Sequence, residues 1–220
     1  MHKDCTRNGA APQRGSPRGG TTQMGGRYVD FQPTDLPGLS VLTPARFGDH
    51  RGFFSESWNR ARLAQHGIET DFVQDNHSVS ERTGTLRGLH FQSPPHAQAK
   101  LVRCGRGRLY DVAVDIRRGS PAYGRWFGLE LSAQNGRQLY IPAGFLHGFV
   151  TLEPDTEIVY KCSDYYAPEC DGAVRWDSAS LGIDWPLEGA PQISDKDAAA
   201  PDMTDFESPF TWDGTSEGAA

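Results

Sequence analysis

Short apolar runs interrupted by polar residues recur along the middle of the chain. The clearest example is 110–116, where large apolar residues alternate with Asp111, Ala113 and Asp115. A period of two is typical of a β-strand. Runs of the same kind occupy 40–42, 72–74, 86–91, 101–104, 127–131, 139–141, 149–152 and 158–161. Gly, Pro, Asn and Asp separate these runs at intervals of roughly ten residues, as turns do between short strands.

Helical patterns are rare by comparison. The stretch 59–66 is the one that convincingly predicts a helix. Successive parallel strands need a long crossover between them, usually a helix, so the pattern excludes a parallel α/β protein. We expect an all-β fold with few short helices, an antiparallel double-sheet jelly roll.

Composition suggests where the folded domain begins and ends. Residues 1–27 are rich in Gly, Pro, Arg, Thr and Gln and lack apolar periodicity, so we expect a disordered N-terminal tail, within which Met24 is an alternative start. We assign one jelly-roll domain to 28–200. The stretch 201–220 is acidic and rich in small residues. We expect it to be a second tail, in which three aromatic residues could dock part of the segment.

Charge and cysteine usage argue against several classes of protein. The 220 residues carry a net charge of −6 at pH 7, which argues against nucleic-acid binding but leaves room for a local basic pocket. No apolar stretch reaches the roughly 18 residues of a membrane span, and the N-terminus lacks the apolar core of a secretion signal. Cys5, Cys104, Cys162 and Cys170 form no C-x-x-C motif, so we expect reduced thiols in a cytoplasmic protein.

The segment 136–150 carries a motif of barrel proteins. Gly136, Pro142, Gly144 and His147 match the G-x5-P-x-G-x2-H pattern of a cupin strand pair. In a barrel the glycines allow tight turns, the proline ends a strand and the histidine points inward. We therefore expect the jelly roll to be a cupin-like barrel.

The matching half of a metal-binding cupin would read G-x5-H-x-H. Here Gly84 and His90 are present, but Gln92 stands where the second histidine would be. A divalent metal needs three or four converging nitrogen or oxygen ligands, and His90 and His147 have no obvious third partner. We expect no bound metal.

A histidine inside a barrel without a metal can act as a general base. Lys100 lies in the strand after His90, and Tyr160 lies in a third strand. Together they suit proton transfer next to a carbonyl. The base removes the α-proton, the cation stabilises the enolate oxygen, and the phenol returns a proton to the opposite face. Spacing leaves an alternative open, in which His90 is a satisfied core residue, Tyr160 a barrel aromatic and Lys100 a surface residue.

A series of motifs carries a resemblance over about 70% of the chain. In order they are FGDHRGFFSE (47–56), FVQDNHS (72–78), LRGLHFQ (86–92), KLVRC (100–104), YDVAVDIR (110–117), QLYIPAGFLHGFV (138–150), YK (160–161), DYY (164–166) and KDAAAP (196–201). In this order they resemble the dTDP-4-dehydrorhamnose 3,5-epimerase family, which makes dTDP-sugars on the way to rhamnose and other deoxysugars.

The resemblance implies a catalytic role for four residues. His90 corresponds to the proton acceptor, and Asp197 to the carboxylate that hydrogen-bonds this histidine and raises its basicity. Tyr160 corresponds to the proton donor. Lys100 corresponds to the lysine beside the C4 carbonyl of the substrate.

A second group corresponds to positions that hold the dTDP-sugar. Tyr166 matches the aromatic residue that stacks on thymine, and Asp171 stands where the family commonly has Glu. The other substrate-binding positions are Arg51, Glu56, Gln74, Asn76, Arg87, His147 and Lys196.

The resemblance also implies the reaction. The protein would convert dTDP-4-dehydro-6-deoxy-D-glucose to dTDP-4-dehydro-L-rhamnose, without a cofactor and as a homodimer. Both C3 and C5 carry protons α to the C4 ketone, so one enolate-stabilising site can serve both. Two alternatives remain open. One is an enzyme that inverts only C3 or only C5 of a related sugar in a secondary-metabolite pathway, and the other is a non-catalytic sugar-nucleotide-binding cupin.

Arg87 poses a geometric problem. It precedes His90 by three residues, and an odd separation puts two side chains on opposite faces of a regular strand. We expect Gly88 to permit a bulge that turns Arg87 back into the cavity.

Overall fold

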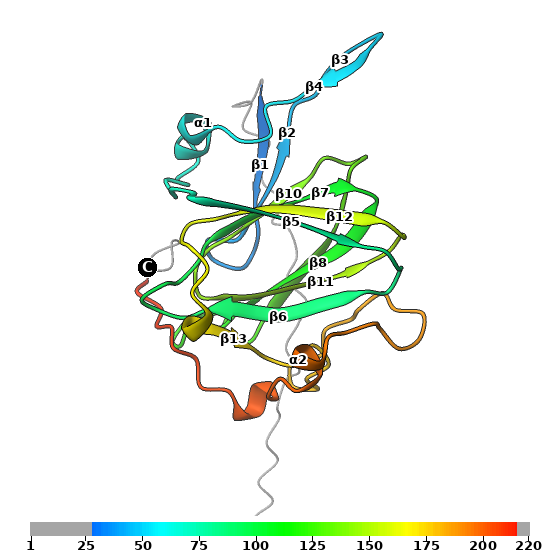
Figure 1. Cartoon of the computed structure of the whole chain (residues 1–220). Helices are drawn as coiled ribbons and strands as arrows, with labels where there is room; N and C mark the ends of the chain where they lie inside the picture. Colours follow the sequence, from blue (N-terminus) through cyan, green and yellow to red (C-terminus); the bar gives the residue numbers. More distant parts are fainter. Residues whose placement is uncertain (1–27, 215–220) are drawn as a thin grey trace, which may run out of the picture.

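The computed structural model describes residues 28–214, and these form two antiparallel sheets that face each other (Figure 1). One sheet consists, in spatial order, of β1 (Val29–Pro33), β2 (Ser40–Pro44), β10 (Gln138–Ile141), β7 (Lys100–Arg106), β12 (Thr156–Cys162) and β5 (Gln74–Ser80). The other consists of β13 (Asp171–Ala173), β6 (Leu86–Gln92), β11 (Phe145–Thr151), β8 (Arg108–Asp115) and β9 (Trp126–Ser132). The expected all-β double-sheet fold is confirmed.

Helices are short, as the sequence predicts. The expected helix at 59–66 is α1 (Arg60–Ala64), whose N-cap Asn59 accepts a hydrogen bond from the backbone N–H of Arg62. The other helical segments are α2 (Asp195–Ala198) and the 3₁₀ turns η1 (Pro168–Cys170) and η2 (Met203–Asp205). In the described part of the chain, no helix is long and apolar enough to cross a membrane.

Several strands differ from the sequence prediction. The run at 72–74 was expected to be a strand, but β5 begins at Gln74 and continues through polar residues to Ser80. Its inward face carries Gln74, Asn76 and Ser78, which line a polar cavity, so the strand lacks the apolar alternation by which strands are recognised. The strand expected at 149–152 begins earlier, at Phe145, and therefore includes His147.

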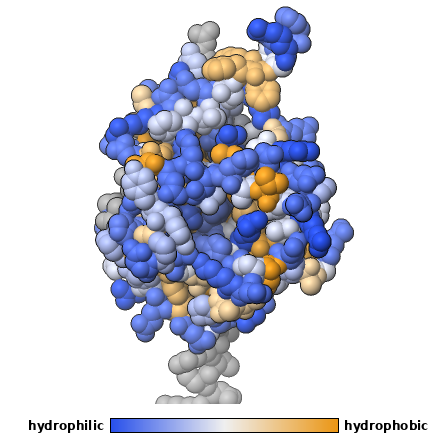
Figure 2. Space-filling model, in the orientation of Figure 1, coloured by the Kyte–Doolittle hydropathy of each residue, from blue (hydrophilic) through white to orange (hydrophobic). Residues whose placement is uncertain are grey.

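Four strands were not expected at all. These are β1, β13 and the two strands of a hairpin, β3 (Phe47–Asp49) and β4 (Gly52–Phe54). The hairpin pairs with neither sheet and projects from the body of the chain (Figure 1). Its hydrophilic tip and the apolar surface beside it stand out in Figure 2, and Phe53 and Phe54 are 59% and 69% exposed.

The main core lies between the two sheets. Apolar residues of β7 and β10 pack there against residues of β8, β9 and β11. The outer face of the five-stranded sheet is also covered by apolar residues. The side chains of β8 point alternately into the two layers, so this strand is buried along nearly its whole length. The polar residues that alternate in this strand, Asp111 and Asp115, are therefore fully buried.

The C-terminal segment supplies part of this second layer. Phe210 is buried in it, Phe206 packs against it, and Arg117 lies over the ring of Trp212 at 4.3 Å. Residues 201–214 therefore pack on the sheet, and the packed structure continues past the domain boundary expected at residue 200. Residues 215–220 and the expected tail at 1–27 lie outside the described residues.

The expected bulge is present in β6. Between the paired positions His147–His90 and Phe149–Arg87, β6 has one residue more than β11. Leu86 and Leu89 consequently both face the outer apolar layer, while Arg87 and His90 both line the cavity. Gly88 has φ +126°, and a Cβ atom there would lie 2.6 Å from the Cα of Gly148.

Gly88→Ala should therefore be strongly destabilising. The added methyl group meets backbone of β11, which cannot move away cheaply, and the positive φ adds strain. We expect a loss of about 2–4 kcal/mol in the free energy of unfolding, measured by urea denaturation. Gly67→Ala is the matched control, because Gly67 also has a positive φ but open space around it. It should cost about 1–2 kcal/mol, and equal losses in the two variants would contradict the close-packing argument.

Candidate active site

A cavity opens between the two sheets and has two compartments. The first, of about 460 Å³, is lined by Arg87, His147 and Asp197 among others. The second, of about 510 Å³, is lined mainly by residues of β5 and β6, together with Tyr166 from the loop after β12 and Asp171 from β13. Residues common to both compartments are His90, Lys100, Tyr160 and Lys196. Three of the four candidate catalytic residues, His90, Lys100 and Tyr160, thus lie where the two compartments meet, and Asp197 lines the first.

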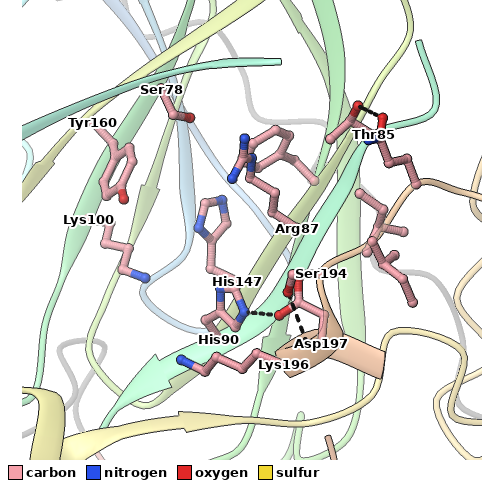
Figure 3. Close-up of a pocket in the computed structure, with 14 residues that line it drawn as sticks. Ser78, Thr85, Arg87, His90, Lys100, His147, Tyr160, Ser194, Lys196 and Asp197 are labelled. Carbon is pink, nitrogen blue, oxygen red and sulfur yellow. Dashed lines mark hydrogen bonds and ion pairs between the residues drawn. The ribbon is translucent and has the colours of Figure 1, made fainter. Parts of the chain in front are cut away.

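His90 and Asp197 form a close pair (Figure 3). The His90 Nε2 atom lies 2.7 Å from Oδ1 of Asp197, and the backbone N–H of Gly88 donates to the other carboxylate oxygen at 3.3 Å. Because Nε2 faces a carboxylate, it carries the proton, and Nδ1 is left to accept one. Asp197 is 3% exposed. Burial alone would raise the pKa of Asp197, but its hydrogen bonds with His90 and Gly88 lower it overall.

The short helix α2 sets the position of this carboxylate. Ser194 caps the helix by accepting a hydrogen bond from the backbone N–H of Asp197 at 3.1 Å. Lys196, one residue earlier, turns towards the other compartment, where it is ion-paired with Asp171. Sequence reasoning did not identify Ser194, although a serine three residues before an acidic residue is a helix N-cap signal.

Lys100 and Tyr160 come from the opposite sheet (Figure 3). Burial lowers the pKa of Lys100, with Cys162, Asp111 and Asp171 opposing that effect. Burial raises the pKa of Tyr160, and Asn76 and Arg87 act in the other direction. The phenol is therefore protonated at neutral pH, in the form that can donate a proton.

His147 has its own buried partner. Its Nε2 lies 3.1 Å from both carboxylate oxygens of Asp111, which is fully buried in β8. Sequence reasoning placed His147 in the site but gave Asp111 no role. The sequence does contain a signal for Asp111, because it alternates with large apolar residues in a strand. A carboxylate buried at such a position requires a polar partner.

The second compartment contains most of the other expected binding residues. Tyr166 is exposed, and its hydroxyl donates to Asp171 at 3.2 Å, while its backbone N–H donates to Gln74 at 3.0 Å. The hydrogen bond with Asp171 raises the pKa of Lys196. An exposed aromatic ring beside a cation and several amides can hold a base and a phosphate.

Arg51 and Glu56 do not reach this cavity within the chain. Arg51 lies at the tip of the β3–β4 hairpin, where its side chain is 78% exposed and ion-paired with Asp49 at 2.5 Å. Glu56 is ion-paired with Arg62 of α1. Neither residue lines either compartment.

Gln92 has a structural role where a metal-binding cupin would have a histidine. It is buried, donates to the backbone carbonyls of His96 and Tyr165, and accepts from the N–H of Ala167. It therefore anchors the loop that carries Tyr166. Among residues 28–214, no group of three His, Cys, Asp or Glu side chains is arranged to hold a metal ion.

Two proton-transfer groups on opposite walls define what the arrangement can do. A base on one sheet and a phenol on the other can act on the two faces of a carbon atom held between them. The cationic Lys100 can stabilise an oxyanion formed next to that carbon. These groups suit removal and return of a proton α to a carbonyl.

Known proteins share this sequence and fold. Residues 33–205 match the family model for dTDP-4-dehydrorhamnose 3,5-epimerase. A protein of that name from Salmonella typhimurium is 52% identical over 169 residues, 76% of this chain and 92% of its own length. The dTDP-6-deoxy-D-glucose-3,5-epimerase of Legionella pneumophila, solved in complex with dTDP-4-keto-L-rhamnose, is 43% identical with a TM-score of 0.81, over 84% of this chain and 100% of that chain.

A relative with narrower specificity is also similar. The 3′-monoepimerase of Streptomyces bikiniensis, solved in complex with dTDP-quinovose, is 36% identical with a TM-score of 0.74. The match covers 78% of this chain and 87% of that chain.

Asp197 should make the stability of the fold depend on pH in the acid range. Its pKa in the folded protein lies below the usual 3.8, so its contribution is complete above about pH 5 and is lost as the pH falls through the lowered pKa. Asp197→Asn removes this dependence. Urea denaturation at a series of pH values should show wild type losing more stability than the variant below about pH 4. Parallel curves for the two proteins would contradict the assignment.

Proposed function

The chain belongs to the dTDP-4-dehydrorhamnose 3,5-epimerase family, and we propose that His90 and Tyr160 perform the proton transfers of its reaction. The protein is an isomerase that acts on a dTDP-sugar. The substrate is dTDP-4-dehydro-6-deoxy-D-glucose, in which C3 and C5 both lie next to the C4 ketone. The observation that carries the proposal is that His90 and Tyr160 project from opposing sheets into one cavity.

Each inversion follows the same course. Nδ1 of His90 takes the proton from the carbon atom, and the electron pair moves into the enolate, whose oxygen is stabilised by Lys100. Tyr160 then gives its proton to the opposite face of the carbon. Since Asp197 holds the proton on Nε2, it fixes the tautomer that leaves Nδ1 free to accept.

The nucleotide is proposed to occupy the second compartment. Tyr166 would stack on thymine there, with Gln74 and Asp171 beside it and Lys196 near the pyrophosphate. The chain is acidic overall, so binding a pyrophosphate depends on the local concentration of positive charge. Arg87, which the bulge turns into the cavity, adds to that charge and can bind a phosphate in a bidentate manner.

Deuterium incorporation tests this function directly. In D2O, wild type should incorporate deuterium at both C3 and C5 of the substrate and invert both centres, as followed by NMR. His90→Asn should reduce both by roughly 10²–10⁴-fold while still binding dTDP. Exchange at only one carbon in wild type would indicate an epimerase that inverts a single centre, and no exchange in wild type would indicate a binding protein. Near-normal turnover by the His90→Asn variant would show that His90 is not the base.

We propose further that the working form is a homodimer in which the β3–β4 hairpin reaches the cavity of the second copy. The hairpin leaves the body of its own chain, and Phe47, Phe53 and Phe54 are exposed on it. Exposed aromatic side chains on a projecting element are typical of an interface. This arrangement would bring Arg51 to a cavity that it does not reach within its own chain.

A mixed dimer separates the two possibilities for Arg51. A heterodimer of Arg51→Ala and His90→Asn chains, isolated with two different tags, should have about half the activity of wild type. One of its two sites then combines an intact His90 with an intact Arg51 from the other chain. If Arg51 serves its own chain, both sites carry a defect and the heterodimer stays as inactive as the single variants. A wild-type protein that is monomeric in solution would contradict the dimer itself.

Independence from metals and cofactors and a cytoplasmic location are also proposed. The reaction only moves protons, which side chains can carry at neutral pH. Cys104, Cys162 and Cys170 have free, buried thiols, which is compatible with a reducing compartment.

A further inference from the structure

A chain of hydrogen bonds runs from Tyr166 in the second compartment to Asn76, the cross-strand neighbour of Tyr160. The backbone N–H of Tyr166 donates to Oε1 of Gln74 at 3.0 Å, and Nε2 of Gln74 donates to Oδ1 of Asn76 at 2.9 Å. The Nδ2 atom of Asn76 in turn donates to Sγ of Cys162 at 3.6 Å, and the Asn76 side chain lowers the pKa of the Tyr160 phenol against the effect of burial. Asn76 on β5 and Tyr160 on β12 are direct cross-strand partners, so the two side chains are held side by side.

The direction of this chain is fixed by its first member. A backbone N–H can only donate, so Gln74 must turn its carbonyl oxygen to Tyr166 and its NH2 group to Asn76. Asn76 then accepts through Oδ1 and has its NH2 group left for Tyr160. A reversed Asn76 amide would bring two NH2 groups face to face. The group that Asn76 can offer to the oxygen atom of Tyr160 is therefore a donor.

We propose that Asn76, held in orientation by Gln74, positions Tyr160 and stabilises the phenolate that forms when Tyr160 gives up its proton. This role differs from holding the dTDP-sugar, and it rests on the proposed function of Tyr160 as the proton donor. The family resemblance implied only a binding role for both residues.

The proton count of the step is balanced. The O–H bond of Tyr160 breaks, a C–H bond forms at the enolate carbon, and the electron pair of the O–H bond stays on the phenolate oxygen. His90 meanwhile holds the proton that it took from the same carbon, and exchange with water returns both residues to their starting forms. The Asn76 hydrogen bond becomes charge-assisted when the phenolate forms, and such bonds are about twice as strong as neutral ones.

The surroundings explain why a donor is needed at this oxygen. Tyr160 is partly buried, and burial raises its pKa. A phenolate in that position has lost part of its hydration, so a fixed N–H group beside it lowers the cost of forming it. Asn76 supplies an uncharged donor. Lys100 therefore remains the cation assigned to the enolate oxygen.

Asn76→Asp tests the role with little change in shape. The variant retains an oxygen that can accept from Gln74, but it presents a second, negatively charged oxygen to Tyr160 instead of an NH2 group. Inversion at C5 should slow by about 10- to 100-fold. Deuterium exchange at C5, which needs His90 but not Tyr160, should stay within about threefold of wild type. Tyr160→Phe is the reference for complete loss of the donor and should show the same separation of exchange from inversion.

Two further variants complete the design. Asp75→Asn is the matched control, because Asp75 is the neighbour on β5 that faces outward, where it pairs with Lys161 at 2.9 Å. Both rates should be unchanged in this variant. Asn76→Ala repeats the test without adding a charge and should also slow inversion more than exchange. Circular dichroism and dTDP binding confirm that each variant is folded.

The possible failures can be told apart. If exchange and inversion fall in parallel in both Asn76 variants, Asn76 acts through substrate binding or structure and the positioning role is wrong. Gln74→Glu can still accept from Tyr166 but cannot donate to Asn76, so it should lower the ratio of inversion to exchange as well. A change confined to KM would overturn the part assigned to Gln74. Absence of exchange and inversion in wild type would instead refute the proposed function itself.

Discussion

The close contact between β6 and β11 at Gly88 and Gly148 is the constraint on which the cavity depends. The backbones approach so closely that a Cβ atom at Gly148 would lie 2.9 Å from the carbonyl oxygen of Arg87. This contact accommodates the bulge, and the bulge aims Arg87 and His90 into the same cavity. It also presents the N–H of Gly88 to Asp197. A local backbone irregularity thus brings a guanidinium and an imidazole into the cavity and supplies an N–H group that anchors the carboxylate paired with the imidazole.

Two buried carboxylates organise the wall that carries the histidines. Asp197 holds His90, and Asp111 holds His147. Each carboxylate is nearly inaccessible to water. Electrostatic interactions in such buried surroundings are stronger than at the surface. The facing wall carries Lys100 and Tyr160, and burial lowers the pKa of the first and raises the pKa of the second. The cavity thus has buried carboxylates behind the histidines on one wall and an amine and a phenol on the other.

Hydrogen bonds connect the second compartment with the strand that lies beside Tyr160. The loop that carries Tyr166 is anchored by Gln92 on one side and by Gln74 on the other. Gln74 also contacts Asn76, the neighbour of Tyr160. Contacts made by Tyr166 in the second compartment can therefore affect the surroundings of Tyr160 through Gln74 and Asn76 on β5.

The sequence by itself determined the all-β class, most strand positions and a set of candidate catalytic side chains. Period-two alternation reports burial on one face, so it located strands such as β8 and β12, and the ordered motifs singled out His90, Lys100, Tyr160 and Asp197 as candidates. It could not identify β5, because a strand whose inward face lines a polar cavity has no apolar pattern to recognise. It also gave Asp111 no role, because a buried carboxylate is explained only by the histidine that packs against it.

Tertiary structure alone decided which of these side chains meet. Asp197 lies 107 residues from His90 in sequence, and only the packing of α2 beside β6 brings the two together. Tertiary packing also decided that the segment with Phe206 and Phe210 lies on the sheet, since these side chains cover an apolar sheet face. Arg51 shows the converse: its motif matches the family, but the hairpin carries it away from the cavity of its own chain. Local sequence fixes which groups a strand or turn can present, whereas their distances depend on the contacts between segments that are remote along the chain.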